Sequence, residues 1–283
     1  MSVAIVTDSA SDLPVDAARA AGIRVVPLVV TFGNQSFRAG VDLSIDEFWD
    51  RMTAPDAPFP TTAAAAPGAF REAFEAAFAG GADAIVAVDV AETLSATIQS
   101  ARVAAGMLPD REVHVVDSRS ASMGVGLLAL LGAEMAAAGA TAAQIASRLE
   151  ARRADIDLHV VLDTLAYLRK GGRLSGPQAA IGTLISVKPI ITVRHGLVEV
   201  ADRPRTRSKA RQRVLELLSA RPVERLAILY TPPADPVPFR DELVARLPGG
   251  IDRAHVSIQP VGPSIGPHVG PGCLGAVLLH TPG

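Results

Sequence analysis

The stretch "VAIVTDSASDLP", residues 3–14, indicates the fold class, because a short apolar, β-branched run leads directly into a polar turn. Apolar runs of similar length follow at 24–32 ("RVVPLVVTF"), 84–88 ("AIVAV") and 113–116 ("VHVV"). Continuous runs of this kind are typical of strands that are covered on both faces. Helical stretches separate them, and this alternation predicts a parallel sheet with helices on both faces.

Two of the helical stretches carry their own start and stop signals. In "SIDE", residues 44–47, Ser44 can cap a helix while the side chain of Glu47 reaches back to it. In "GAFREAFEAAFAGG", residues 68–81, phenylalanine recurs every four residues until two glycines stop the helix. Both segments are therefore predicted helices between strands.

The pattern changes after the charged stretch at 147–158. "KPIITVRHGLVEVADRP", residues 188–204, predicts two antiparallel strands joined at His195-Gly196. A long helix at 208–220 and the strands "LAILY" and "AVLLH" complete a second unit, and the prolines between 232 and 238 indicate a stiff loop. We predict two domains, an N-terminal parallel α/β domain at 1–157 and a mixed-sheet α/β domain at 158–283.

Composition excludes several classes of protein. Of the 283 residues 49% are hydrophobic, and the net charge is -2, which is typical of a globular protein and unlike a nucleic-acid binder that neutralises phosphates. The first residues lack the pattern of a signal peptide, so we expect a cytoplasmic protein. The longest uncharged apolar stretch, 120–133, is shorter than the roughly 20 residues of a membrane span and predicts a buried helix.

Cysteine and histidine usage predicts no metal site. The single cysteine, Cys273, excludes an intramolecular disulfide and a zinc site of several thiolates. The six histidines show no spacing typical of metal ligands. Cys273 leads into an apolar strand, so we interpret it as a small buried residue and not as a nucleophile.

Polar clusters follow the predicted strands, where open parallel sheets gather their ligands. In the first, at 7–14, Asp12 is expected to cap a helix. The second, "PTTAAAAP" at 60–67, contains Thr61 and Thr62, and the third, at 90–101, opens a helix near Ser95. Ser95 has two interpretations, as a cap of its own helix or as part of a seat for an anion. Asp117 and Ser118, in the fourth cluster at 116–126, are equally ambiguous.

Two glycine-rich segments in the second half carry further candidates. Gly171-Gly172 is expected to end a helix, after which Arg173 can approach a partner or an anion. His268 stands in a glycine and proline segment, predicted to be a loop, and loops on a rigid scaffold carry many binding residues.

Taken in order, these clusters resemble the DegV family, the bacterial fatty-acid-binding proteins also called FakB. The motifs that carry the resemblance are "TDSASDLP" at 7–14, "PTTA" at 60–63, "LSAT" at 94–97, "VDS" at 116–118, "DTLAYLRKGGR" at 163–173, "KPI" at 188–190 and "GPHVGPG" at 266–272. Each motif alone is weak, but their order along the whole chain is specific.

The resemblance implies a two-domain α/β carrier that holds a long-chain fatty acid, such as hexadecanoate, between its domains. It also implies that a separate ATP-dependent fatty acid kinase phosphorylates the carboxylate for phospholipid synthesis, so the chain itself is no catalyst and needs no cofactor. Thr61, Thr62 and Ser95 would donate to the carboxylate, and His268 would complete the network. Arg173 would lie near the surface that meets the kinase, and a membrane surface would be contacted transiently.

Two positions depart from the family pattern. Ala63 replaces the serine of "PTTS" and Ala96 replaces the glycine of "LSGT", so one hydroxyl is missing and one backbone approach is more crowded. The small residues 63–66 leave room either for a methylene chain or for close helix packing.

Two rival functions remain open at the level of sequence. One is a hydrolase with Ser95 as nucleophile and His268 as its base, although no third member can be assigned. The other is a phosphate or nucleotide binder that uses the helix starts near 9–12, 95 and 118.

Overall fold

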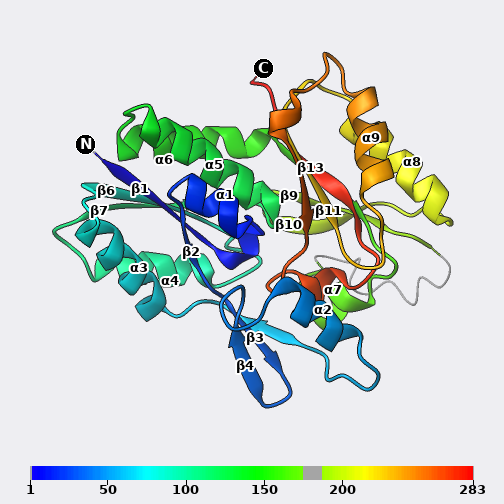
Figure 1. The fold of residues 1–283 in the computed structure, drawn as a ribbon, viewed down its shortest axis with the longest axis horizontal. Helices are drawn as coiled ribbons and strands as arrows, with labels where there is room; N and C mark the ends of the chain where they lie inside the picture. Colours follow the sequence, from blue (N-terminus) through cyan, green and yellow to red (C-terminus); the bar gives the residue numbers. More distant parts are fainter. Residues whose placement is uncertain (1, 175–186, 283) are drawn as a thin grey trace.

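The computed structural model describes residues 2–174 and 187–282. Within these ranges the chain forms a four-stranded sheet, a six-stranded sheet and a small three-stranded sheet, with helices between and around them (Figure 1). The architecture is the predicted one, a parallel α/β unit followed by a mixed-sheet α/β unit.

The four-stranded sheet is parallel throughout and has the order β2-β1-β6-β7. Its strands are β1 (Val3–Asp8), β2 (Arg24–Val26), β6 (Ala84–Asp89) and β7 (Glu112–Asp117). Every residue of β6 is buried, as expected for a central strand with helices on both faces. The predicted strands at 3–7, 84–88 and 113–116 are thus confirmed.

The expected strand at 24–32 is wrong as a single element. Pro27 separates β2 from β3 (Val29–Phe32), and β3 turns away into the small antiparallel sheet β4-β3-β5, with β4 at Gln35–Arg38 and β5 at Thr61–Ala63. Proline has no N–H to donate to a strand ladder, so a strand is interrupted there.

The helices of the first half cover this sheet on both faces. Helices α5 (Met123–Ala137) and α6 (Ala142–Arg152) pack on one face, while α3 (Pro67–Ala79) and α4 (Thr97–Gly106) pack on the other. Helix α2 (Ile45–Thr53) has the predicted capping box between Ser44 and Glu47, and α3 ends at Gly80 as predicted.

The six-stranded sheet is mixed, with the order β10-β9-β8-β13-β11-β12, and only its β11–β12 pair is parallel. Its strands are β8 (Ile156–Val161), β9 (Ile190–Arg194), β10 (Leu197–Asp202), β11 (Val223–Tyr230), β12 (Val256–Pro260) and β13 (Leu274–His280). The β9–β10 hairpin turns at His195-Gly196 with positive φ at both residues, which confirms the predicted turn.

The outer face of this sheet packs against α8 (Arg207–Leu218) and α9 (Val237–Arg246). Helix α8 was predicted, whereas β12 and α9 were not. The proline-rich segment in fact leads into α9, because Pro238 stands in the first turn, where a missing N–H costs nothing. Short helices complete the fold, namely α1 (Val15–Ala20), α7 (Ala166–Lys170), α10 (Gly266–Val269) and the 3-10 turns η1 (Ser9–Ser11), η2 (Arg153–Asp155) and η4 (Arg253–His255).

Helix α5 lies between the two large sheets and contacts β1 and β6 of one and β8, β11 and β13 of the other (Figure 1). It is the predicted buried helix at 120–133, and its apolar residues join one core that runs through both halves.

We propose to keep the division at residue 157, which assigns all but the first two residues of β8 to the second domain. Among the helices of the described ranges, none has the length and apolar character needed to cross a membrane.

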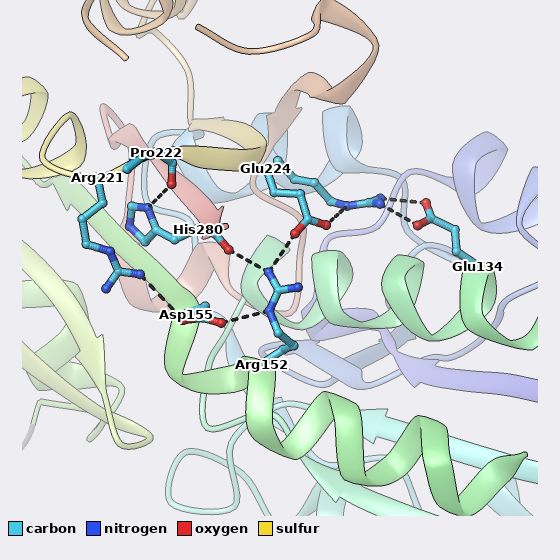
Figure 2. A network of polar contacts seen from close by, with 8 residues as sticks. Glu134, Arg152, Asp155, Arg221, Pro222, Glu224 and His280 are labelled. Atoms are coloured by element: carbon cyan, nitrogen blue, oxygen red, sulfur yellow. Dashed lines mark hydrogen bonds and ion pairs between the residues drawn. The ribbon is translucent and has the colours of Figure 1, made fainter. Parts of the chain in front are cut away.

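A polar network also joins the two halves (Figure 2). The buried guanidinium group of Arg152, at the end of α6, donates to Asp155, to Glu224 on β11 and to the His280 carbonyl on β13, at 2.7–2.9 Å. Arg225 pairs with Glu134 of α5. A buried charged group is costly unless its N–H donors are paired. These hydrogen bonds therefore hold the end of α6 in place against β11 and β13.

Candidate functional site

A largely apolar cavity lies between the two large sheets, at the carboxyl ends of β1 and β6. Residues of the six-stranded sheet form one wall. Successive side chains of a strand point to opposite faces, so Leu158 and Val160 of β8 face the cavity while Val161 packs in the core under α8. The other apolar lining residues include Leu28, Val90, Leu94, Ile191, Val193, Val198 and Leu229. The space open to the centre of a water molecule is about 80 Å³, which is enough for several waters.

Polar side chains gather in this apolar lining, and four of the five predicted site residues are among them. Thr62, Ser95, Arg173 and His268 all line the cavity. They come from β5, from the turn before α4, from the segment after α7 and from α10. Segments far apart in the sequence thus converge on one space.

Thr62 and His268 contact each other directly. The Thr62 hydroxyl lies 3.0 Å from Nε2 of His268, while the buried Nδ1 has no hydrogen-bond partner among the described residues. Burial, helped by the charge of Arg173, lowers the pKa of His268 from 6.5 to about 4. The imidazole is therefore uncharged near neutral pH, and the unpartnered nitrogen leaves it free to act as donor or acceptor toward a ligand.

His268 does not stand in a loop, as predicted, but in the short helix α10. Gly171, at the end of α7, lies against the ring, and a Cβ there would overlap Nδ1. The Gly171-Gly172 pair ends α7 as predicted, and it also makes room for the histidine.

Thr61 is the predicted site residue that the structure does not bring to the cavity. It precedes Thr62 on β5, and successive side chains of a strand point to opposite faces, so Thr61 is exposed to solvent. Ala63 and Ala64 line the cavity, whereas Ala65 is buried against the phenylalanines of α3. The alanine run is thus divided between the cavity lining and packing against α3.

Ser95 makes local hydrogen bonds at the start of α4 and also lines the cavity. Its hydroxyl lies 2.8 Å from the Thr97 hydroxyl and accepts from the Thr97 N–H at the start of α4, while Ala96 occupies the N-cap position. The same side chain lines the cavity. No hydrogen bond links Ser95 to His268 in the described part of the chain, so the nucleophile–base pair of the hydrolase hypothesis is not formed.

Arg173 also lines the cavity. It is half-buried, and its guanidinium group donates to the carbonyl oxygens of Leu94 and Gly171 at 3.2 and 2.6 Å. It thereby ties the segment after α7 to the turn that carries Ser95. A cation at this position makes the electrostatic potential in the cavity more positive.

Two serines of the lining were not predicted as site residues. Ser264, two residues before the quoted segment at 266–272, shares a hydrogen bond of 2.8 Å with Ser9, and Ser9 accepts from the Leu28 N–H. Ser122 donates to Asp12 at 2.5 Å. Each serine lies in a turn that follows a strand, and that position was the signal available in the sequence. The sequence does not show which of these turns lie together in the folded chain.

The expected helix cap at Asp12 is wrong. Helix α1 begins only after Pro14, and the Asp12 side chain instead accepts from the Ser122 hydroxyl and, across the two halves, from the Gly262 N–H at 2.9 Å. Its carboxyl group is enclosed, and this burial raises the pKa of Asp12 to about 7. Asp12 therefore joins the two halves beside the cavity.

Two further buried acids, Asp8 and Asp89, lie next to residues that line the cavity. Asp8 is buried and accepts from the N–H groups of Ala10 and Val90, two cavity-lining residues, at 2.6 and 2.8 Å. Neither oxygen of buried Asp89 meets an N–H or O–H donor among the described residues, which leaves the Asp8 carboxylate as its partner. Burial and the charge of Asp8 raise the pKa of Asp89 well above its usual range, so Asp89 is the protonated member and donates to Asp8.

Cys273 is buried in the lining as expected, and burial raises the pKa of its thiol. Asp117 and Ser118 lie outside the cavity lining, and Asp117 accepts from the N–H groups of Glu92 and Arg119. Residues 2–174 and 187–282 contain no cluster of three or more histidine, cysteine or acidic side chains that could hold a metal ion.

Comparison with known proteins agrees with the fold and with the motifs. The chain is 36% identical over 280 residues to a DegV domain-containing protein of Streptomyces coelicolor, covering 98% of each chain. It is similar to the structure of a DegV family protein of Thermus thermophilus described by its fatty acid binding, with a TM-score of 0.90, 34% identity and coverage of 99% and 100%. A stearic acid-binding protein of Eubacterium ventriosum has a TM-score of 0.86, 25% identity and coverage of 98% and 97%.

A family model supplies the last comparison. The model, described as an uncharacterised protein of the DegV family, matches residues 2–281, which is nearly the whole chain. With that match, and with a relative at 36% identity over nearly its full length, the chain belongs to the DegV family.

Proposed function

We propose that this protein binds a long-chain fatty acid in the cavity between its sheets, with the carboxylate at Thr62, Ser95 and His268. One observation carries the proposal: hydroxyls from two separate segments and an uncharged histidine line one cavity whose remaining lining is largely apolar. The Thermus and Eubacterium structures, described as binding fatty acid, support the choice of ligand.

The two parts of a fatty acid need different surroundings, and the cavity offers both. A sixteen-carbon tail gains roughly 10 kcal/mol on burial, at about 0.8 kcal/mol per methylene, before entropy losses. A hydrogen bond to the charged carboxylate contributes about 1.5 to 3 kcal/mol. The apolar walls therefore supply the affinity, and Thr62 and Ser95 fix the orientation.

We further propose that the protein is a cytoplasmic carrier that presents the carboxylate to a separate ATP-dependent kinase. In that step a carboxylate oxygen attacks the γ-phosphorus of ATP, ADP leaves, and an acyl phosphate forms for phospholipid synthesis. Neutral hydroxyl donors suit such a carrier, because they hold the carboxylate without a permanent counter-charge on the attacking oxygen. Arg173 is half-exposed at this end of the cavity, so we expect the kinase to approach there, and release of the lipid to need a transient membrane contact.

The experiment is native mass spectrometry of the purified protein, followed by titration with a fluorescent fatty acid. We expect a retained ligand with the mass of a fatty acid and stoichiometric binding of the probe. A protein that carries no lipid and binds no probe contradicts the proposal, as does hydrolysis of an ester substrate that disappears in Ser95→Ala.

A further inference from the structure

A second concavity lies where the turn after β7, the end of α6 and the tip of the β9–β10 hairpin meet, and of its described lining residues only Val193 also lines the first cavity. The volume open to the centre of a water molecule in this concavity is about 450 Å³. Four arginines line it, and each comes from a different segment: Arg119, Arg153, Arg194 and Arg221. We call this concavity the arginine groove.

Two of these arginines have no partner of their own. Among residues 2–174 and 187–282, neither the guanidinium group of Arg119 nor that of Arg194 makes a hydrogen bond or an ion pair, and both residues are exposed. Most other arginines of the chain pair with a carboxylate or a carbonyl, as Arg152 does with three acceptors (Figure 2).

The remaining two arginines are only partly engaged. Arg153 donates one N–H to the Asp117 carbonyl at 3.0 Å, and Arg221 reaches Asp155 at 3.7 Å, a weak pair that Figure 2 shows at the edge of the network. A guanidinium group carries five N–H donors, so most of those on Arg153 and Arg221 remain available.

Two carboxylates also line the groove and reduce its charge. Asp157 faces Nδ1 of His159 at 2.9 Å and Nε2 of His280 at 3.6 Å, and although burial alone would raise the pKa of Asp157, these two imidazoles hold it well below its usual range. Glu150 is exposed. Four guanidinium groups therefore face two carboxylates, which leaves an excess of positive charge in a concave space.

The backbone brings the turn that carries Arg119 to the hairpin tip beside Arg194, and both residues line the groove. Arg119 and the neighbour of Arg194, His195, both have positive φ, at 51°, a conformation that costs free energy for a residue with a side chain. The N–H of Gly196 donates to the Arg119 carbonyl at 3.1 Å, which fastens the hairpin tip to the turn. Two strained positions on segments joined by a hydrogen bond thus place two arginines in the lining of one groove, where an anion would reduce the excess of positive charge.

We propose that the arginine groove is a binding site for a phosphoryl-bearing anion, either a free phosphorylated small molecule or the headgroup of an anionic phospholipid. The planar guanidinium fork matches two phosphate oxygens at once, and arginine is the residue that recognises phosphate in this way. The site is distinct from the helix starts near 9–12 and 95, which surround the lipid cavity. Binding at this site does not depend on fatty-acid binding.

The test measures binding of inorganic phosphate, pyrophosphate and ATP to the full chain by titration calorimetry at low ionic strength. In parallel, co-sedimentation with phosphatidylglycerol vesicles is compared with phosphatidylcholine vesicles. The variant is Arg119→Gln/Arg194→Gln. The matched control is Arg19→Gln/Arg71→Gln, which removes the same charge from two exposed arginines that pair with acids on their own helices.

We expect saturable one-to-one binding that weakens about 10-fold or more in the groove variant and changes little in the control. Binding of soluble phosphates identifies a free ligand, and binding confined to phosphatidylglycerol vesicles identifies a headgroup. No binding in either arm overturns the proposal, and so does an equal loss in both variants, because that would show attraction by overall charge. Thermal melting checks that both variants fold, and the fluorescent fatty-acid titration separates this result from the proposed lipid function.

Discussion

The hydroxyl of Thr62 lies 3.0 Å from Nε2 of His268, although 206 positions of chain separate the two residues. The contact joins β5 of the small sheet to α10 of the second half, and it places both side chains in the lining of the apolar cavity. The polar end of the cavity therefore exists only when both halves are folded and in contact.

Replacing either hydroxyl should weaken fatty-acid binding. We expect Thr62→Ala and Ser95→Ala each to cost about 1 to 3 kcal/mol, or about 5- to 150-fold in affinity, because one carboxylate oxygen loses its donor. Thr61→Ala is the matched control, since that threonine is the exposed neighbour on the same strand. A fluorescent fatty-acid titration measures all three, and unchanged affinity in Thr62→Ala and Ser95→Ala would place the carboxylate elsewhere.

The pKa of His268 predicts a loss of stability in acid. Because its pKa falls from 6.5 to about 4 on folding, the unfolded chain binds a proton between these values that the folded chain does not bind. The contribution of His268 to the free energy of unfolding is therefore complete above pH 6.5 and is lost as the pH falls toward 4. Urea unfolding at about pH 7 and about pH 4.5 should show a smaller pH dependence in His268→Gln than in the wild type. Equal slopes would mean that the imidazole is solvated.

Asp12 should act in the opposite direction. Its pKa rises from 3.8 to about 7 on folding, so the folded chain holds a proton that the unfolded chain has lost. This contribution is complete below pH 3.8 and disappears as the pH rises through 7. Between about pH 5 and about pH 8, Asp12→Asn should therefore lose less stability than the wild type, as measured by urea unfolding. A larger loss in the variant would contradict the raised pKa.

Of the two buried acids Asp8 and Asp89, only Asp89 should tolerate substitution by asparagine without a large loss in the free energy of unfolding. Asp89→Asn keeps a donor toward Asp8, so we expect a small change in the free energy of unfolding. Asp8→Asn removes the second acceptor oxygen, leaves the N–H of Ala10 or Val90 unpaired, and should cost about 1 to 3 kcal/mol. Urea unfolding of both variants at neutral pH makes the comparison. If Asp89→Asn is the more damaging, the proton does not reside on Asp89.

The two glycines after α7 should separate binding from stability. In Gly171→Ala the new Cβ overlaps the His268 ring, so the ring must move and we expect about 5- to 10-fold weaker fatty-acid binding as its hydrogen bond to Thr62 is lost. In Gly172→Ala the Cβ meets open space, but the φ of 68° costs about 1 to 2 kcal/mol of stability. Titration and thermal melting of both variants test this, and equal binding losses would show that His268 does not set the affinity.

The sequence by itself determined the elements and most of the candidate site. Apolar runs gave β1, β6 and β7, the capping box gave α2, and His195-Gly196 gave the hairpin, because each signal is local and acts within a few residues. Thr62, Ser95, Arg173 and His268 were identified from their motifs and all line the cavity. These features follow from backbone and capping preferences, which depend on neighbours along the chain.

Tertiary structure alone decided which polar groups meet. Thr61 and Thr62 are equivalent in the sequence, and only the pairing of β5 with β3 turns one into the cavity and the other into solvent. Asp12 has the local pattern of a helix cap, yet its partners Ser122 and Gly262 lie 110 and 250 residues away. A helix cap contributes about 1 kcal/mol, whereas burying a carboxyl group without hydrogen-bond partners costs more. The packing of the two halves therefore overrides the capping preference of Asp12.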